Sequence, residues 1–203
     1  MRIDYTVCDV LLLAGGMNRR MHGYFKGDLK YGSESFLKRI WNSLYDGTGK
    51  MVISVSDSGH VPAGVEEWEK VFDVFHGIGP VAGLISGLEA CSSKYVAVCG
   101  CDMPFITKEL YLSLFQAGFQ GFIQKGYEPK AIIPVSQDGV HPLSGLYSKS
   151  ATYDLSRSVE NGEYSIRKCL PQDHVVFMDI SRRPELLRSV TNINTIEEYR
   201  GLK

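Results

Sequence analysis

The stretch VLLLAGGMNRRMHGYFKG, residues 10–27, decides how this chain begins to fold. Its first four residues are apolar and end near the Gly15–Gly16 pair, which predicts a short buried strand followed by a turn. Glycine lets the backbone come close to a ligand, so that successive amide N–H groups point at phosphate oxygens. Arg20 and Lys26 add positive charge that suits a polyphosphate. We therefore predict a phosphate-binding loop; the alternative is a strand-to-helix turn with solvated basic residues.

The loop is neither a Walker loop nor a dinucleotide-binding fingerprint. No Gly-Lys-Ser/Thr closes it, and its glycines lack the G-x-G-x-x-G spacing. It is also too long and too basic for a tight strand-to-helix turn. We expect a flap that folds over a triphosphate.

The composition bounds the class of protein. A chain of 203 residues with 44% hydrophobic content can bury one good core, so one domain is expected. A formal net charge of −1 argues against a general nucleic-acid or membrane-surface binder. No targeting or membrane segment is visible, and we expect a cytoplasmic protein. The five cysteines are odd in number and scattered, which indicates reduced, buried thiols.

The first half of the chain alternates predicted strands and helices. The predicted strands cover residues 10–13, 51–55, 71–75 and 95–99. The predicted helices cover residues 36–44 behind a Ser33/Ser35 cap, 62–68, 80–88, and a segment after Thr107. This alternation favours an α/β fold, a three-layer αβα arrangement with a mostly parallel, Rossmann-like sheet. Ligands bind such sheets outside the carboxyl ends of the strands, where both the Gly15–Gly16 loop and Asp102 are expected.

The second half changes character. Residues 119–124 and 130–135, separated by a turn with Gly126 and Pro129, are predicted to be strands. Helices are expected over 151–159 and 165–170, then a strand over 174–178 and a helix after Thr195. With no repeat and no long linker, we expect a single domain over 1–203, with a nucleotide-binding half (about 1–117) and an acceptor-binding half (about 118–203).

Cys101-Asp102-Met103-Pro104 directly follows a predicted buried strand. A carboxylate past a strand end is well placed to hold Mg²⁺, which takes one or two carboxylates together with substrate phosphates and water. The alternative is a turn aspartate that caps the next segment. Zinc is not expected, because Cys99 and Cys101 lack a second Cys/His pair at zinc-ligand spacing.

Three further segments carry polar side chains that suit a ligand. Gly79 and Gly83 open a helix whose amino end would approach a base or ribose closely, and Asp73 lies just upstream; helix–sheet packing explains the glycines equally well. His141 is a possible proton carrier, although an orienting hydrogen-bond partner is the favoured interpretation. Asn192 and Asn194 alternate on one face of an extended segment, which suits a phosphate or polar heterocycle, or a simple Asx-rich turn.

Taken in order, these motifs resemble those of the molybdenum cofactor guanylyltransferases, which join a GMP unit to molybdopterin. The resemblance covers most of the chain: L-A-G-G with Arg20, Gly23 and Lys26, G-P-x-A-G at 79–83, C-D-x-P at 101–104, His141-Pro142, and N-x-N-T-x-E-E at 192–198. It implies a fold of the nucleotide-diphospho-sugar transferase type, Mg²⁺ as cofactor, GTP and molybdopterin as partners, and transient contact with cofactor-insertion proteins or target molybdoenzymes.

Three groups of site residues follow from the motifs and the resemblance. The predicted catalytic residues are Arg20, Lys26 and Asp102, with Asp102 also holding the metal. The predicted nucleotide-binding residues are Leu13, Ala14, Gly15, Gly16, Lys26, Ser54, Asp73, Gly79 and Asp102. The predicted acceptor-binding residues are Gly23, His141, Asn192 and Asn194.

The sequence departs from the family pattern at three positions. His22 stands where members usually have glycine, and Phe25 replaces an acidic residue before the lysine. Ser54 aligns roughly with a position where relatives can carry asparagine near the base. The alternatives left open are a CTP-dependent cytidylyltransferase, a nucleotidyltransferase acting on another small phosphate, and a non-catalytic paralogue that binds nucleotide or cofactor.

Overall fold

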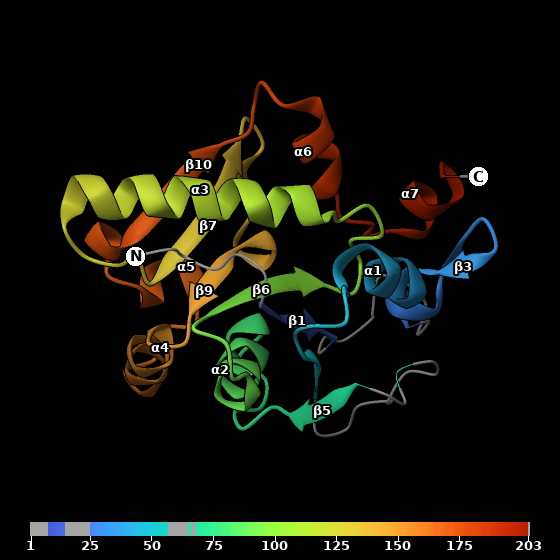
Figure 1. Ribbon diagram of the computed structural model, residues 1–203. Coiled ribbons are helices and arrows are strands. Elements are labelled where there is room, and N and C mark those ends of the chain that lie inside the picture. Colours follow the sequence, from blue (N-terminus) through green and yellow to red (C-terminus); the bar gives the residue numbers. More distant parts are fainter. Residues whose placement is uncertain (1–7, 15–24, 57–64, 66–67, 203) are drawn as a thin grey trace.

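One mixed sheet forms the centre of the molecule (Figure 1). The computed structural model describes residues 8–14, 25–56, 65 and 68–202. The strands of the sheet lie in the order β10-β7-β9-β6-β1-β4-β5, and β8 pairs with β7 at one end. Their bounds are β1 Asp9–Leu13, β4 Met51–Val55, β5 Glu69–Phe72, β6 Tyr95–Gly100, β7 Ala131–Ser136, β8 Gly139–Val140, β9 Leu146–Ser148 and β10 Val175–Asp179. A separate hairpin pairs β2 (Lys30–Tyr31) with β3 (Glu34–Ser35).

Parallel pairing brings the ends of four strands to one edge of the sheet. Strand β1 pairs in parallel with both β4 and β6, and β4 pairs in parallel with β5. The register sets Leu13 opposite Ser54 on one side and opposite Gly100 on the other. β9 runs antiparallel to both β6 and β7, and β10 runs parallel to β7. The predicted mostly parallel sheet is confirmed.

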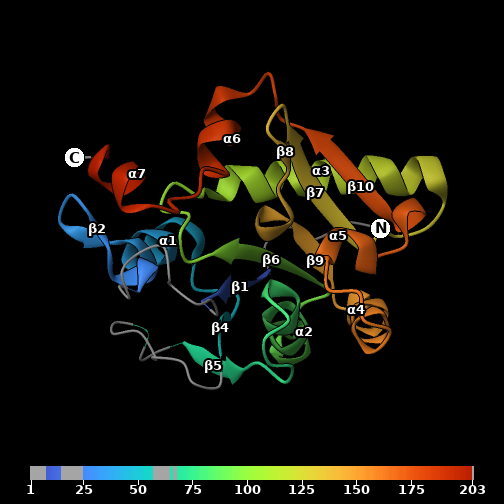
Figure 2. The same cartoon turned by 180° about the vertical axis from the view of Figure 1, so that it is seen from behind.

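Helices cover both faces of the sheet, as Figures 1 and 2 show from opposite sides. The helices that pack on one face are α1 (Phe36–Leu44), α3 (Lys108–Lys125) and α6 (Pro184–Ser189). Those on the other face are α2 (Pro80–Ala90), α4 (Ala151–Glu160) and α5 (Ile166–Cys169). The short helix α7 (Ile196–Arg200) lies beside the β2–β3 hairpin. The predicted three-layer αβα arrangement is confirmed.

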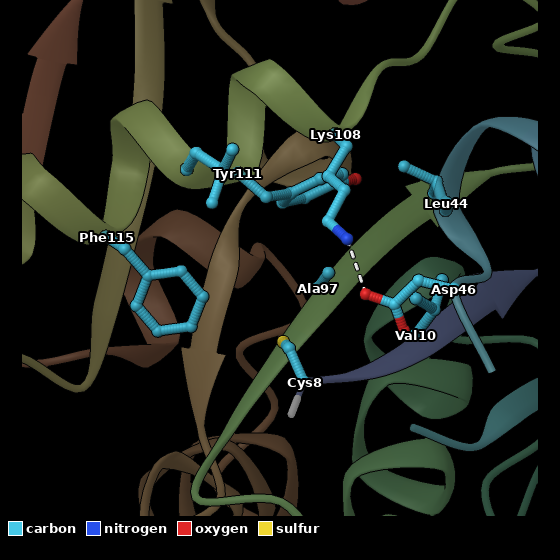
Figure 3. Close-up of a pocket in the computed structure, with 9 residues that line it drawn as sticks. Cys8, Val10, Leu44, Asp46, Ala97, Lys108, Tyr111 and Phe115 are labelled. Carbon is cyan, nitrogen blue, oxygen red and sulfur yellow. Dashed lines mark hydrogen bonds and ion pairs between the residues drawn. The ribbon is translucent and has the colours of Figure 1, made fainter. Parts of the chain in front are cut away.

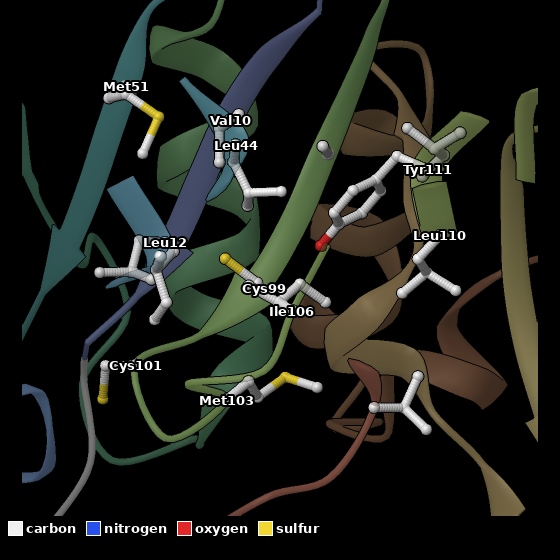
Figure 4. Packing of buried hydrophobic residues seen from close by; sticks show 14 of the residues in the cluster. Val10, Leu12, Leu44, Met51, Cys99, Cys101, Met103, Ile106, Leu110 and Tyr111 are labelled. Atoms are coloured by element: carbon white, nitrogen blue, oxygen red, sulfur yellow. The ribbon is translucent and has the colours of Figure 1, made fainter. Parts of the chain in front are cut away.

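The alternation of β1 side chains separates the two halves of the core. Val10 and Leu12 pack with α1 and α3 (Figure 4), whereas Leu11 and Leu13 pack with α2. All five residues of β1 are buried. A strand that is covered on both faces requires an unbroken apolar run, which is the pattern that the sequence shows at residues 10–13.

The predicted strand over residues 119–124 is wrong, because these residues form the second half of α3. Their aromatic and β-branched side chains resemble a strand, yet Phe119, Phe122 and Ile123 are exposed on the outer side of the helix. The buried positions are Gly118 and Gly121, which share a helix face. A Cβ at Gly118 would lie 2.8 Å from Ile132, and one at Gly121 would lie 2.6 Å from Val176, so both glycines let α3 approach the sheet.

Other boundaries differ less. The strand predicted over 71–75 is β5, Glu69–Phe72, and the chain leaves it before Asp73. β8, β9 and α6 were not predicted as separate elements. The helix predicted from Pro62 falls largely outside the described residues.

Helix starts are among the predictions that the structure confirms. Ser35 caps α1, because its hydroxyl accepts a hydrogen bond from Lys38 N. Pro80 occupies the first turn of α2, where a missing N–H is tolerated. Thr107 is the N-cap residue of α3, although its hydroxyl bonds to Ser189 rather than to the helix.

The predictions about the cysteines and about membrane segments can also be compared with the structure. All five cysteines are free thiols, and four of them are buried. None of the helices in the described part of the chain is both long enough and apolar enough to span a bilayer.

Candidate active site

Backbone hydrogen bonds continue past the ends of the parallel strands and fix the loops that follow them. Ala14 N donates to Ser54 O (2.9 Å), and Cys101 N donates to Leu13 O (3.2 Å). On the outer side, Asp73 N donates to Val55 O (3.1 Å). The ladder therefore places Asp73 and the turn that carries Asp102 at the carboxyl edge predicted to bind a ligand.

Lys26, Asp102 and Asn194 meet at this edge. The Lys26 ammonium donates to Asp102 Oδ2 (2.9 Å) and to Asn194 Oδ1 (2.8 Å). The Lys26 and Asp102 side chains are only 16% and 15% exposed, so little water screens the pair. Lys26, near the end of the predicted phosphate-binding loop, begins the 3₁₀ turn η2 (Lys26–Asp28). A cation, a carboxylate and a carboxamide from three distant segments thus form one polar cluster.

The turn after β6 holds the Asp102 carboxylate in place. A Cβ at Gly100 would lie 2.6 Å from Asp102 Oδ1, so the carboxylate lies over a position that only glycine leaves open. Met103 Sδ accepts a hydrogen bond from Gly100 N (3.4 Å) underneath the turn. From the other side, Ile193 N donates to Asp102 O (2.9 Å). Asp102 is therefore fixed by both β6 and the C-terminal segment.

Ser54 and Asp73 form a second polar pair on the neighbouring strands. The Ser54 hydroxyl is fully buried and donates to Asp73 Oδ1 (2.5 Å). Burial raises the pKa of Asp73, and the bond from Ser54 lowers it, leaving the pKa above its ordinary value. An Asp73 carboxylate partly withdrawn from water attracts hydrogen-bond donors of a ligand.

The first turns of α2 bring backbone close to that pair. A Cβ at Gly83 would lie 2.5 Å from Ser54 Oγ and 3.2 Å from Asp73 Oδ1, so the glycine permits the contact. Gly79 precedes the helix with φ at 79°, a conformation that side chains rarely adopt. Close helix–sheet packing, one of the two interpretations of this G-P-x-A-G segment, is present at Gly83.

His141 lies in a separate hydrogen-bonded loop. Its Nε2 and the Ser136 hydroxyl are 2.8 Å apart, and its backbone N donates to Pro134 O (3.0 Å). Burial lowers the pKa of His141. The Tyr147 hydroxyl donates to Pro142 O (2.7 Å) and fixes the 3₁₀ turn η3 (Pro142–Ser144) that follows. Within the described residues, His141 has no hydrogen bond to Lys26, Asp102 or Asn194.

The remaining predicted residues fall into two groups. Asn192 is partly buried and, like Asn194, flanks the buried Ile193. The predicted residues Gly15, Gly16, Arg20 and Gly23 lie outside the described residues. Gly100 and the Ile193 backbone were not predicted to hold Asp102; the neighbouring C-D-M-P and N-x-N motifs are the only sequence signals for them.

The residues present fit a magnesium ion only together with a substrate. The described residues include no cluster of three or more His, Cys, Asp or Glu side chains suited to a metal ion. Asp102 supplies one carboxylate in the cluster, and Mg²⁺ is commonly held by one or two carboxylates completed by substrate phosphates and water. A site of this kind is compatible with the predicted triphosphate ligand.

Two hollows in the described part of the molecule are lined by residues other than the three of the polar cluster. One of about 40 Å³ lies at the amino end of β1, beside Cys8 and Val10, where Lys108 reaches Asp46 (Figure 3). It is far smaller than the roughly 300 Å³ of a small-molecule site. The other, an open groove of about 560 Å³, is lined by Asp28, Leu29, Lys30, Tyr31, Gly32, Tyr199 and Leu202. Neither hollow contains Lys26, Asp102 or Asn194.

Comparison with known protein families decides the class of the protein. The family model of the MobA-like NTP transferase domain matches residues 10–176, a range that includes Lys26, Ser54, Asp73 and Asp102. The chain belongs to the MobA-like NTP transferase family. It is therefore a nucleotidyltransferase, and the predicted resemblance is confirmed.

The names and the structure of individual relatives are consistent with this family assignment. A protein of Clostridium perfringens named as a probable molybdenum cofactor guanylyltransferase is 31% identical, over 94% of this chain and 93% of its own length. A Methanosarcina mazei protein with the same name is 28% identical, over 95% of this chain and 88% of its own. The crystal structure of molybdopterin-guanine dinucleotide biosynthesis protein A from Archaeoglobus fulgidus superposes with a TM-score of 0.74, covers 96% of each chain and is 24% identical. The predicted nucleotide-diphospho-sugar transferase type of fold is confirmed.

Proposed function

We propose that this MobA-like chain transfers GMP from GTP to the terminal phosphate of molybdopterin and releases pyrophosphate. The observation that carries the proposal is the contact of the Lys26 ammonium with both Asp102 and Asn194 at the carboxyl edge of the sheet. The names of the relatives supply the substrates: both proteins compared above are named as guanylyltransferases of the molybdenum cofactor.

The reaction needs no nucleophile from the protein. A phosphate monoester of molybdopterin is already an anionic nucleophile at neutral pH, and one of its oxygens attacks the α-phosphorus of GTP. The new P–O bond forms as the bond between the α-phosphorus and the bridging oxygen to the β-phosphate breaks, and pyrophosphate leaves with that electron pair. The protein therefore contributes position and charge.

We assign Lys26 the role of the cation that contacts the reacting phosphates. Its ammonium has three N–H donors, and Asp102 and Asn194 account for two of them. A third N–H directed at a phosphate oxygen offsets negative charge that builds up in the transition state. We assign Arg20 the same task from the glycine-rich loop, as the sequence analysis predicts.

Asp102 is the residue that would hold magnesium. When bound, Mg²⁺ would neutralise charge on the phosphate oxygens of the nucleotide. Asp102 can accept in several directions, because a carboxylate has about four lone-pair sites and Lys26 uses one of them. The contact from Ile193 N to the Asp102 backbone keeps the carboxylate in position while its partners change.

The Ser54–Asp73 pair would select the base. Guanine presents two adjacent kinds of N–H donor on its Watson–Crick edge, and a carboxylate accepts from both. Cytosine presents one amino donor next to a ring acceptor, which a carboxylate repels. Asp73 Oδ1 is fixed by Ser54, so the carboxylate is oriented before the base arrives. This arrangement favours GTP over CTP.

We assign the two halves of the chain to the two substrates. Residues of about 1–117 hold the nucleotide, and residues of about 118–203 hold the acceptor through His141, Asn192 and Asn194, together with Gly23 from the loop. Asn194 joins the halves, because its side chain contacts Lys26. Transfer of the finished dinucleotide to cofactor-insertion proteins or target molybdoenzymes, in the cytoplasm, completes the proposal.

The proposal is tested by pyrophosphate release. The full chain is incubated with Mg²⁺ and GTP, CTP, UTP or ATP in turn, with and without molybdopterin, and the product is identified by its mass. We expect pyrophosphate only with GTP, Mg²⁺ and molybdopterin together. Pyrophosphate release with CTP in place of GTP would identify a cytidylyltransferase. If no combination of nucleotide and acceptor releases pyrophosphate, the result would support a non-catalytic binding protein.

A further inference from the structure

The C-terminal segment contacts two parts of the candidate site: the turn that carries Asp102 and the segment that carries Lys26. Ile193 N donates to Asp102 O (2.9 Å), and Asn194 Oδ1 accepts from the Lys26 ammonium (2.8 Å). Farther along, Tyr199 reaches Lys30. Three contacts therefore connect residues 193–199 to the turn that carries Asp102 and to the segment over residues 26–30. The family model ends at residue 176, before this segment begins.

Helix α7 fixes the spacing between Asn194 and Tyr199. The helix has five residues, too few to be stable in isolation. A capping box stabilises it, with Thr195 Oγ1 accepting from Glu198 N (3.2 Å). Glu198 Oε2 accepts from Asn194 N (2.6 Å) and from Thr195 N (3.2 Å). The backbone that positions the Asn194 side chain is therefore tied directly to α7.

Tyr199 attaches α7 to the segment after Lys26. Its hydroxyl donates to Lys30 O (2.9 Å) and accepts from Lys30 N (3.3 Å), so one oxygen satisfies both backbone groups of a single residue. Its ring lies edge-on to Phe36, with centroids 6.1 Å apart. A phenylalanine would keep the ring contact and lose both hydrogen bonds.

Backbone hydrogen bonds link the position of Lys30 to that of Lys26. Leu29 N donates to Lys26 O (3.2 Å), which closes the turn η2. Phe36 N donates to Leu29 O (2.8 Å) and attaches the same turn to helix α1. Between these two bonds, Tyr199 holds the backbone of Lys30. A shift at Lys30 would therefore move the end of η2 from which the Lys26 side chain extends.

We propose that Tyr199 is a positioning residue: by holding the Lys30 backbone, it keeps the Lys26 ammonium between Asp102 and Asn194. In this role the residue acts through Lys26. The expected effect of Tyr199 on the reaction rate rests on the proposed nucleotidyl transfer. The expected effect of Tyr199 on the position of Lys26 does not depend on that proposal.

The first test observes Lys26 directly in the full-length protein. An ammonium held by two acceptors exchanges its protons slowly, so it gives an ¹⁵Nζ-detected NMR signal, which Lys26→Arg assigns by its disappearance. We expect Tyr199→Phe to abolish or broaden this signal. Tyr127→Phe is the matched control: Tyr127 also donates to a backbone carbonyl, Asp173 O (2.7 Å), and lies past the far end of α3, which spans about 27 Å.

The second test is kinetic and separates positioning from stability. At a temperature where circular dichroism shows all variants folded, we expect Tyr199→Phe to lower kcat about 10-fold, the size expected for two hydrogen bonds of ordinary strength, with the KM for GTP changed less. Tyr127→Phe should retain wild-type kcat. In a Lys26→Ala background, Tyr199→Phe should cause little further loss.

Either of two results would overturn the proposed role of Tyr199. An unchanged Lys26 signal in Tyr199→Phe, or losses that multiply in the double variant, would show that Tyr199 does not act through Lys26. If the wild-type protein releases no pyrophosphate with any nucleotide, the proposed function fails, and the NMR comparison still decides the role of Tyr199.

Discussion

Lys26 and Asp102 are 76 positions apart in the chain, yet the Lys26 ammonium lies 2.9 Å from Asp102 Oδ2. Both side chains are largely buried, and burying either charge alone would carry a large desolvation penalty. Asn194 shares the ammonium, so Lys26 contacts a neutral acceptor as well as the carboxylate. Together, these contacts prepare a charged site before any substrate is bound.

Removing either member of this pair should reduce nucleotidyl transfer severely. We expect Lys26→Ala and Asp102→Asn each to lower kcat/KM by on the order of 100-fold or more, because each change deletes a preorganised electrostatic partner. Initial rates of pyrophosphate release measure the effect. Lys50→Ala is the control, since Lys50 pairs with Glu69 in an ion pair whose side chains are about half exposed. Near-normal rates in both site variants would contradict the assignment.

Gly83→Ala should impair GTP binding as well as stability. Its Cβ would come within 2.5 Å of Ser54 Oγ, so the Ser54–Asp73 pair must move. We expect a loss of about 1–3 kcal/mol in the free energy of unfolding, typical of overpacking, measured by urea denaturation. Calorimetric titration should show weaker GTP binding. Gly87→Ala, whose Cβ would meet Leu11 instead, should destabilise the fold while GTP affinity per folded molecule stays close to wild type.

Asp9 should make stability depend on acidic pH. Burial raises the pKa of this carboxyl group, but hydrogen bonds from Lys50 N, Ser93 and Ser92 N outweigh it and leave the pKa below its ordinary value. Because the folded-state pKa is depressed, the stabilisation is complete above the unfolded pKa of about 3.9 and is lost as pH falls through the folded pKa.

We therefore expect Asp9→Asn to lower the free energy of unfolding by about 2 kcal/mol at neutral pH. The gap between the variant and wild type should narrow below pH of about 4, where Asp9 of the wild type becomes protonated. Urea denaturation across pH 3–7 measures both. Asp138→Asn, at an exposed turn position, serves as the control. A gap that is constant over this range would contradict the ionic role of Asp9.

The thiols should be unreactive in the folded protein. Burial raises the pKa of Cys8, Cys91 and Cys101 to about 12 each, and it also raises the pKa of Cys99 and Cys169. The thiolate is the reactive form, so a disulfide reagent at pH of about 8 should modify these thiols slowly. Denaturant should expose all five to rapid modification. Rapid reaction of several thiols under native conditions would argue against this burial.

Local patterns predicted much of the fold because their causes are local. The apolar run at 10–13, the Ser35 cap and Pro80 each act within a few residues, and the structure has a strand or a helix start at each. The strand prediction for residues 119–124 was wrong because their secondary structure depends on contacts with distant residues. Gly118 and Gly121 become helix-packing positions only when Ile132 and Val176 lie beneath them.

The same division applies to the site. Motifs in the sequence identify Lys26, Asp102 and Asn194 as candidates, since a charge after a glycine-rich loop and a carboxylate after a buried strand suggest phosphate chemistry wherever they occur. Their assignment to catalysis and to substrate binding remains a prediction that the variants above test.

By itself, the sequence determined the order of most strands and helices, the two turns predicted to bind a ligand, and the family. Only the tertiary structure decided that Asn194 shares the Lys26 ammonium across 168 positions, that Ser54 orients Asp73, and that Tyr199 holds Lys30. These contacts depend on which strands pair, in what register, and on where the C-terminal segment returns to the sheet. Such long-range choices minimise the free energy of the whole chain, so no short stretch of sequence encodes them.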